Sequence, residues 1–211
     1  MSLPAMQPIF SNNDDVDKTA YINWRMSQGS DIQNMLNLAD GFLLSAIHLA
    51  KQCLLDNIHK QADILIFPML ANANHGIELY LKGIVWILNE LTHSPYKIEG
   101  GHNIQQIYST VAAKIRSYGG HLSAKDFSEA TQELKFYLDE LFEQMQPNRR
   151  NDKMDFSRYP FSKDYEDHVY VAAIGNVCID LENFVARFTA IHEKLDQITS
   201  FLYYQEFREE L

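Results

Sequence analysis

Apolar residues recur at spacings of three and four along nearly the whole chain, and no segment alternates between apolar and polar residues. The first spacing places apolar side chains on one face of an α-helix, whereas a half-buried strand requires a spacing of two. The sequence therefore predicts an all-α fold, an up-and-down helical bundle of about five helices with a long C-terminal helix. The expected helices span about 31–58, 61–92, 102–118, 124–146 and a final stretch of more than forty residues that includes Ile174, Cys178 and Leu202.

Capping and breaking residues predict where several of these helices begin and end. Ser30 or Asp31 is expected to cap the first helix. The glycine pair 119–120 is expected to end the third helix, and Pro147 to end the fourth. Pro68 predicts either a kink in the second helix or a helix start near that residue.

The length of 211 residues favours one hydrophobic core. Residues 1–29 are expected to form a poorly ordered N-terminal lead-in, from which Tyr21, Ile22 and Trp24 can dock on the body, and residues 30–211 a single helical domain. No N-terminal signal pattern is present, and the longest uncharged run, of 14 residues, is too short and polar to cross a membrane. We therefore expect a cytoplasmic protein without a membrane partner.

Both cysteines, Cys53 and Cys178, lie in apolar stretches that read as helical, so we expect buried free thiols. The spacings Asp56–His59 and Glu90–His93 resemble half of a di-metal motif, but each falls at the end of its helix, where ligands of a bundle core would not lie. We therefore expect no metal and no cofactor.

The net charge of −10 disfavours general binding to nucleic acid, but residues 147–163 are locally basic. This segment carries +3, from five basic residues against two acidic ones: Arg149, Arg150, Lys153, Arg158 and Lys163 against Asp152 and Asp155. A local basic cleft can bind RNA or a nucleotide despite the acidic surroundings. The expected ligand-binding residues here are Arg149, Arg150 and Tyr159.

Beside this basic segment, Lys163, His168 and Tyr170 lie within about two turns at the expected start of the last helix. An imidazole can act as acid or base near neutral pH, and a cation can stabilise the charge of a phosphorane. The set therefore suits metal-free cleavage of a phosphodiester. The alternative is an ordinary first helical turn rich in acidic residues.

A second polar group is predicted on the helix over 61–92. His75, Glu78 and Lys82 are separated by three and four residues, so they form one polar ridge beside the apolar face. They are candidate ligand-binding residues of a polar cleft. The alternative is an ordinary glutamate–lysine pair with a surface histidine.

Three short motifs resemble the HEPN superfamily of small α-bundles. Residues 73–83, Ala-Asn-His-Gly-Ile-Glu-Leu-Tyr-Leu-Lys-Gly, resemble a helix with a Glu-Leu-x-x-Lys core. Residues 101–104, Gly-His-Asn-Ile, are similar to the Gly-His-Asp-Leu that often opens the next helix, and 156–160, Phe-Ser-Arg-Tyr-Pro, to a stretch before the final helix. The resemblance covers roughly residues 35–195 and implies that residues 30–211 form a HEPN-like domain, expected as a homodimer.

The ribonuclease branch of that superfamily opens its last helix with an arginine, four to six further residues, a histidine and often x-Tyr. The resemblance implies His168 as acid or base, Tyr170 as the residue that orients the substrate, and Lys163 or Arg158 as the cation. Because lysine lacks the bidentate fork of arginine, we rank a module that binds a nucleotide, RNA or a protein partner such as an antitoxin first. A metal-independent ribonuclease of a toxin or phage-defence system is second, and a purely structural oligomerisation bundle is third.

Overall fold

The computed structural model describes residues 8–144 and 177–208, and within these ranges every regular element is helical. The predicted all-α bundle is therefore confirmed. The elements are the short 3-10 turn η1 (Val16–Lys18) and the helices α1 (Asp31–Leu55), α2 (Ala62–Leu91), α3 (Ile104–Tyr118), α4 (Ala124–Ala130), α5 (Gln132–Gln144) and α7 (Leu181–Phe201), with α7 continued by the π-helical segment η4 (Leu202–Phe207).

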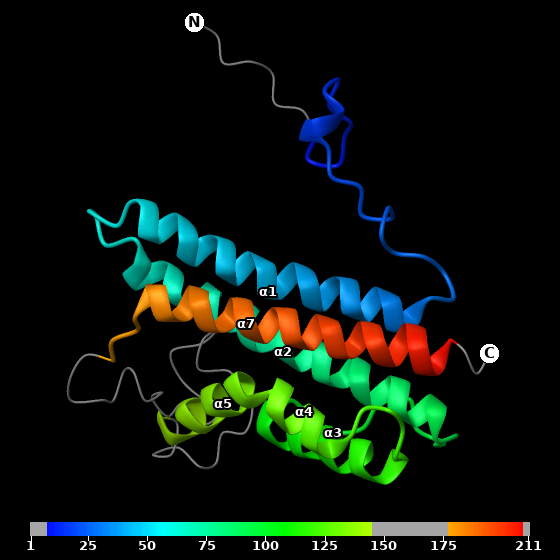
Figure 1. The fold of residues 1–211 in the computed structure, drawn as a ribbon. Coiled ribbons are helices and arrows are strands. Elements are labelled where there is room, and N and C mark those ends of the chain that lie inside the picture. Colours follow the sequence, from blue (N-terminus) through cyan, green and yellow to red (C-terminus); the bar gives the residue numbers. More distant parts are fainter. Residues whose placement is uncertain (1–7, 145–176, 209–211) are drawn as a thin grey trace, which may run out of the picture.

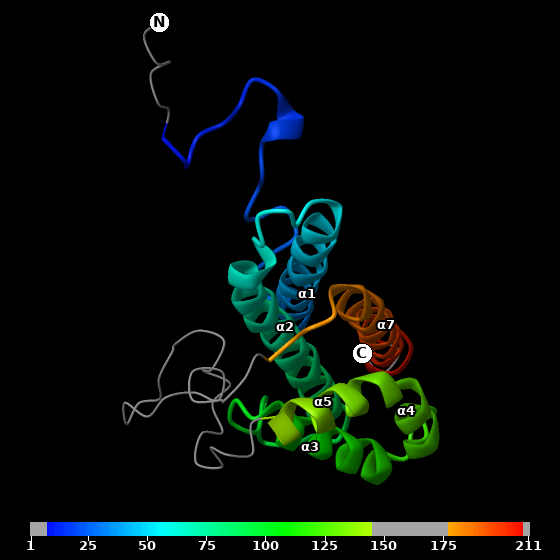
Figure 2. The same ribbon diagram turned by 90° about the vertical axis from the view of Figure 1, so that its left-hand side faces the viewer.

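The bundle is built around α2, which packs against α1, α3 and α7. Figure 1 shows α1, α2 and α7 side by side, and Figure 2 shows α3, α4 and α5 as a second layer below α2 and α7. Because α2 is covered on several sides, it is apolar around most of its circumference. Its residues Ile77, Leu81, Ile84 and Leu88 are at most 1% exposed.

Gly76 allows α1 and α2 to approach closely. A Cβ atom on Gly76 would lie 2.9 Å from both the Cβ and the backbone nitrogen of Leu43, and 3.0 Å from the carbonyl oxygen of Ala39. These distances are shorter than a normal contact, so only glycine fits without a shift of α1. The close approach fixes the position of the neighbouring polar residues of α2 along the axis of α1.

Two of the predicted helices differ from the observed ones. The helix predicted over 124–146 is broken at Thr131, whose hydroxyl bonds to the carbonyl of Phe127 at 2.7 Å and to the hydroxyl of Tyr108 at 3.0 Å. The second helix spans Ala62–Leu91 and continues through Pro68, which confirms the predicted span of about 61–92 and leaves no helix start at the proline.

The last helix begins at Leu181, much later than the periodicity predicts. The carboxylate of Asp180 accepts hydrogen bonds from the backbone nitrogens of Glu182 at 2.9 Å and Asn183 at 3.1 Å, which caps the helix at that point. Residues 177–180 are not helical and Cys178 is exposed, so the predicted buried thiol is wrong there, whereas Cys53 is buried as expected. The continuous helix of more than forty residues is therefore not formed.

The described part of the N-terminal segment, residues 8–29, projects from the bundle (Figure 1). Asn34 of α1 bonds to the backbone of Ser27, and Asn37 donates to the carbonyl of Arg25, so its base is attached to α1. By length and composition alone, α1 is the one described helix that could cross a membrane, and 33% of its apolar window is buried inside the bundle.

Candidate ligand site around Glu78

The basic segment predicted to bind a phosphate lies outside the described residues. This applies to all of the residues named for it: Arg149, Arg150, Arg158, Tyr159, Lys163, His168 and Tyr170. The expected position of His168 and Tyr170 at a helix start therefore stays a prediction.

The polar residues predicted on the second helix do lie together. Lys82 Nζ is 2.7 Å and His102 Nδ1 is 2.9 Å from the same oxygen, Oε1 of Glu78. His75 Nδ1 lies 3.9 Å from Oε2, which is too far for a hydrogen bond. The Glu78 side chain is only 5% exposed, so this carboxylate is a buried acceptor shared between α2 and the residue that precedes α3.

Spacing along α2 explains part of this arrangement. Glu78 and Lys82 are four residues apart and therefore face the same side of the helix, with His75 one turn earlier. His102 comes from the connection between α2 and α3, next to Asn103, whose side chain caps α3 by accepting from the backbone nitrogen of Gln106 at 3.0 Å. The cap fixes the point at which His102 meets Glu78.

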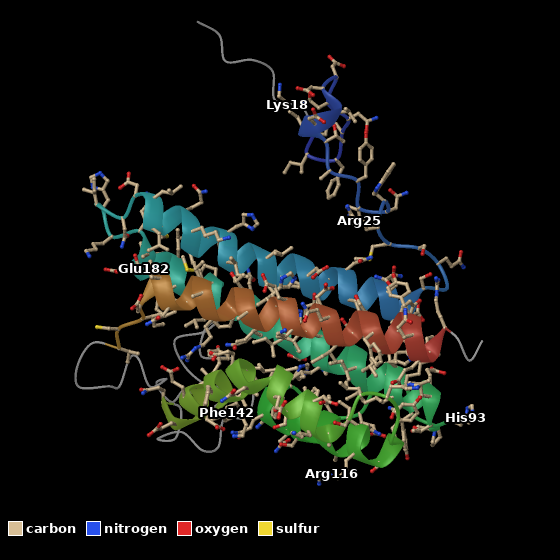
Figure 3. All side chains as sticks on the ribbon, in the orientation of Figure 1. Lys18, Arg25, His93, Arg116, Phe142 and Glu182 are labelled. Atoms are coloured by element: carbon tan, nitrogen blue, oxygen red, sulfur yellow. The ribbon has the colours of Figure 1, made fainter. Side chains whose placement is uncertain are left out.

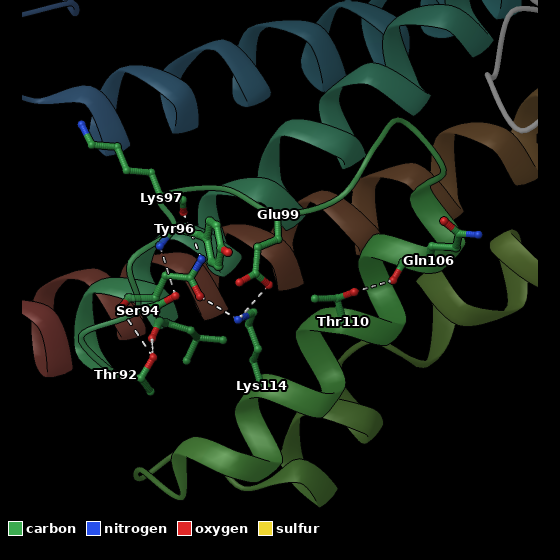
Figure 4. Close-up of polar contacts among 10 residues, drawn as sticks. Thr92, Ser94, Tyr96, Lys97, Glu99, Gln106, Thr110 and Lys114 are labelled. Carbon is green, nitrogen blue, oxygen red and sulfur yellow. Dashed lines mark hydrogen bonds and ion pairs between the residues drawn. The ribbon is translucent and has the colours of Figure 1, made fainter.

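The connection that carries His102 is itself held by a polar network (Figure 4). Lys114 of α3 donates to Oδ1 of Asn89 at 2.7 Å and pairs with Glu99 at 3.0 Å. Asn89 in turn donates to the carbonyl oxygen of Lys97 at 3.2 Å. These bonds attach the connection to both α2 and α3, so the backbone that carries His102 is held in place.

The electrostatics of the site keep Glu78 ionised. Burial alone would raise the pKa of this carboxyl group, but the neighbouring His75, Lys82 and His102 outweigh burial and lower its pKa to about 2. Judged by distance, Lys82 and His102 contribute most, because His75 lies more than 3.5 Å away. Glu78 is therefore an anion at neutral pH, and its charge is balanced by the ammonium group of Lys82.

Two groups of the site remain available to a ligand. The His102 side chain is 67% exposed, and because Nδ1 faces a carboxylate, Nδ1 carries the proton and Nε2 points away from Glu78. Lys82 has three donors, of which Glu78 uses one. Both groups lie close to the N-terminus of α3, whose first turn contains no acidic residue and whose dipole favours an anion.

Two further polar side chains of α2, Asn74 and His75, precede Glu78 by about one helical turn. Asn74 is 3% exposed, and its oxygen accepts from the hydroxyl of Tyr137 at 2.5 Å. The ring of His75 packs edge-on against Phe42, with centroids 4.5 Å apart.

A second cluster joins α1, α2 and α7, and the sequence did not predict it. Asp40 Oδ1 lies 2.8 Å from His192 Nε2 and also accepts from the hydroxyl of Tyr80. Burial raises the pKa of Asp40, but the hydrogen bonds from His192 and Tyr80 outweigh burial, so the pKa of Asp40 is lowered. The pKa of Asp196 is raised by burial and by the nearby charge of Asp40. The available signal was Asp40 itself, the one charged residue between Ile32 and Ala50.

The described residues contain no group of three or more histidine, cysteine, aspartate or glutamate side chains that could hold a metal ion. At the former di-metal candidate, Glu90 accepts a hydrogen bond from the indole nitrogen of Trp86 at 3.0 Å. Comparison with known protein families, characterised proteins and solved structures finds no match to this chain. The resemblance to the HEPN superfamily, the homodimer and the cytoplasmic location therefore stay predictions.

Proposed function

We propose that this protein is a HEPN-like binding module, acting as a homodimer, that holds an anionic ligand at the Glu78 site. The ligand class is a nucleotide or an RNA phosphate. The observation that carries the proposal is a buried carboxylate that turns the exposed imidazole of His102 outward, beside the ammonium group of Lys82.

Within this proposal each residue has a distinct part. Lys82 and the protonated imidazole of His102 donate hydrogen bonds to phosphate oxygens. Glu78 positions both donors and does not touch the ligand.

The proposal is tested by calorimetric titration with ATP and by fluorescence titration with a short labelled single-stranded RNA. A charge-assisted hydrogen bond contributes about 1.5–3 kcal/mol, so His102→Ala is expected to weaken binding by roughly tenfold or more. His121→Ala is the matched control, since His121 is 89% exposed and also lies near a buried glutamate, Glu206, at 3.7 Å. Failure of both probes to bind wild type, or equal affinity of His102→Ala, contradicts the proposal.

The second candidate is a metal-independent ribonuclease of a toxin or phage-defence system, and the +3 charge of residues 147–163 favours it. In this case His168 acts as acid or base, Lys163 or Arg158 holds the phosphate, and Tyr170 orients the substrate. An RNA-cleavage assay separates the two candidates. Cleavage that is lost in His168→Ala and retained in His102→Ala supports the ribonuclease.

A further inference from the structure

The N-terminal arm, defined as residues 8–29, exposes an unusual amount of apolar surface. Tyr21 and Trp24 belong to one turn, closed by a hydrogen bond of 3.2 Å from the Trp24 nitrogen to the Tyr21 carbonyl, and their rings lie 6.2 Å apart. Ile22 and Trp24 are each 79% exposed and Tyr21 is 49% exposed. The expectation that these three residues dock on the body of their own chain is therefore wrong.

A second apolar surface lies at the hairpin end, where α1 passes into α2. Its four large side chains are exposed by 44–84%: Leu54, Leu55, Ile58 and Ile64. Surfaces of this kind on a folded chain mark places where another surface binds. The arm and the hairpin end are thus two unpaired apolar surfaces on one molecule.

A hydrogen bond between the arm and α1 keeps these two surfaces apart within one chain. Asn37 holds the carbonyl of Arg25, and Figure 3 shows Arg25 close to α1 and Lys18 further out. From Asn37 to Leu55 is about 27 Å along α1 at 1.5 Å per residue. Trp24 is next to Arg25 in the chain. Ile22 is three residues from Arg25, which is a chain length of at most about 10 Å. Neither side chain reaches the hairpin end of its own molecule.

From this geometry we infer that a second copy of this chain covers both surfaces. In a twofold pair with antiparallel α1 helices, the Tyr21–Trp24 turn of each copy lies over the hairpin end of the other, which is an isologous and closed arrangement. The homodimer of the proposed function thereby gains a specific interface, but this inference does not depend on the Glu78 site.

The apolar area that the two surfaces offer agrees with this pairing. At roughly 150 Å² for each fully exposed large side chain, the observed exposures give about 700 Å² in one contact. Two symmetric contacts give about 1,400 Å², which is the size of a standard stable interface.

The interface is tested on the full chain by sedimentation velocity. Wild type is expected to form a dimer, and Trp24→Ala and Ile58→Asp are each expected to raise its dissociation constant by at least tenfold. Tyr96→Ala is the control, because Tyr96 is 64% exposed but follows the opposite end of α2. A wild type that stays monomeric at all concentrations, or a dimer that neither substitution weakens, overturns the inference.

Cysteine cross-linking then shows which chain the arm contacts, in a Cys178→Ser background that removes the exposed thiol. A tagged Trp24→Cys chain mixed with an untagged Ile58→Cys chain is expected to give a disulfide-linked heterodimer. Cross-linking only within one chain that carries both cysteines overturns the inference. Flotation of wild type with anionic phospholipid vesicles, lost in Ile58→Asp, also overturns it and assigns the surface to a membrane.

Discussion

Replacement of Glu78 by glutamine tests whether the buried carboxylate is as strongly stabilised as its contacts indicate. Glutamine keeps the size of the side chain and one acceptor oxygen but removes the charge that faces Lys82 and His102. Lys82 is only 13% exposed, so its ammonium group then lacks a counter-charge in a poorly solvated place. We therefore expect Glu78→Gln to be less stable than wild type at neutral pH.

The magnitude follows from the pKa of Glu78, which falls from its ordinary value of 4.5 to about 2. Because a tenfold change in an acid dissociation constant corresponds to about 1.4 kcal/mol, this fall sets an upper bound of roughly 3 kcal/mol. His102 is largely exposed and solvent screens its contribution, which reduces the expected loss to about 2 kcal/mol. For a chain of this length, that corresponds to a melting temperature lower by about 4–8 °C.

The pH dependence gives the sharper test. The folded-state pKa lies below the unfolded value of 4.5, so the stabilisation by ionised Glu78 is complete above that value and is lost as pH falls through about 2. Urea unfolding of wild type and Glu78→Gln is compared at about pH 7, 5 and 3. The difference in free energy of unfolding between the two proteins should be nearly the same at about pH 7 and 5 and smaller at about pH 3. A difference that persists unchanged at about pH 3 refutes the electrostatic explanation.

The matched control for that experiment is Glu129→Gln. Glu129 pairs with Lys125 at the same four-residue spacing, but at 3.7 Å and with the two side chains 66% and 82% exposed. Exposed pairs of this kind contribute less than about 0.5 kcal/mol. If Glu129→Gln lowers the free energy of unfolding as much as Glu78→Gln does, burial of the carboxylate does not explain the destabilisation.

Three smaller predictions concern stability and are checked by thermal and urea unfolding. Gly76→Ala should cost about 1–2 kcal/mol, because the new Cβ meets the backbone of Leu43, and an unchanged melting temperature contradicts the close approach of α1 and α2. Gly83→Ala should be neutral or stabilise by up to about 1 kcal/mol, because its Cβ meets only the flexible end of Leu36 at 2.7 Å. Asp180→Ala should cost about 1 kcal/mol and Asp180→Asn much less, since asparagine also caps helices; equal losses speak against the cap.

The helices were predictable because their apolar faces are long and regular. The core positions of α2, such as Ile77, Leu81, Ile84 and Leu88, repeat at three and four and are buried as that repeat requires. Where the apolar repeat continues across the end of one helix and the start of another, it wrongly predicts a single helix. The spacing from Ile174 through Cys178 to Leu181 reads as one helix, yet Asp180 satisfies the backbone donors of a new helix start.

The candidate site was predictable only as far as local spacing reaches. His75, Glu78 and Lys82 lie within two turns of one helix, so their grouping follows from helix geometry. His102 is 24 residues from Glu78, and the pairing of Asp40 with His192 spans 152 residues, so both depend on how helices pack. A glycine–histidine pair just before a helix start, at residues 101–102, was visible as a family motif but not as a partner of Glu78.

The two proposed functions differ in whether the described residues include the groups that carry them. In the ribonuclease pattern the catalytic histidine belongs to the start of the last helix, where its position is fixed by helix packing. Here the described part of the last helix begins at Leu181, and His168 lies outside the described residues. The imidazole of His102, by contrast, is held by a buried carboxylate on a braced connection, and a positioned donor is what phosphate recognition requires. The binding module therefore rests on groups whose geometry the structure describes, whereas the ribonuclease rests on residues outside the described ranges.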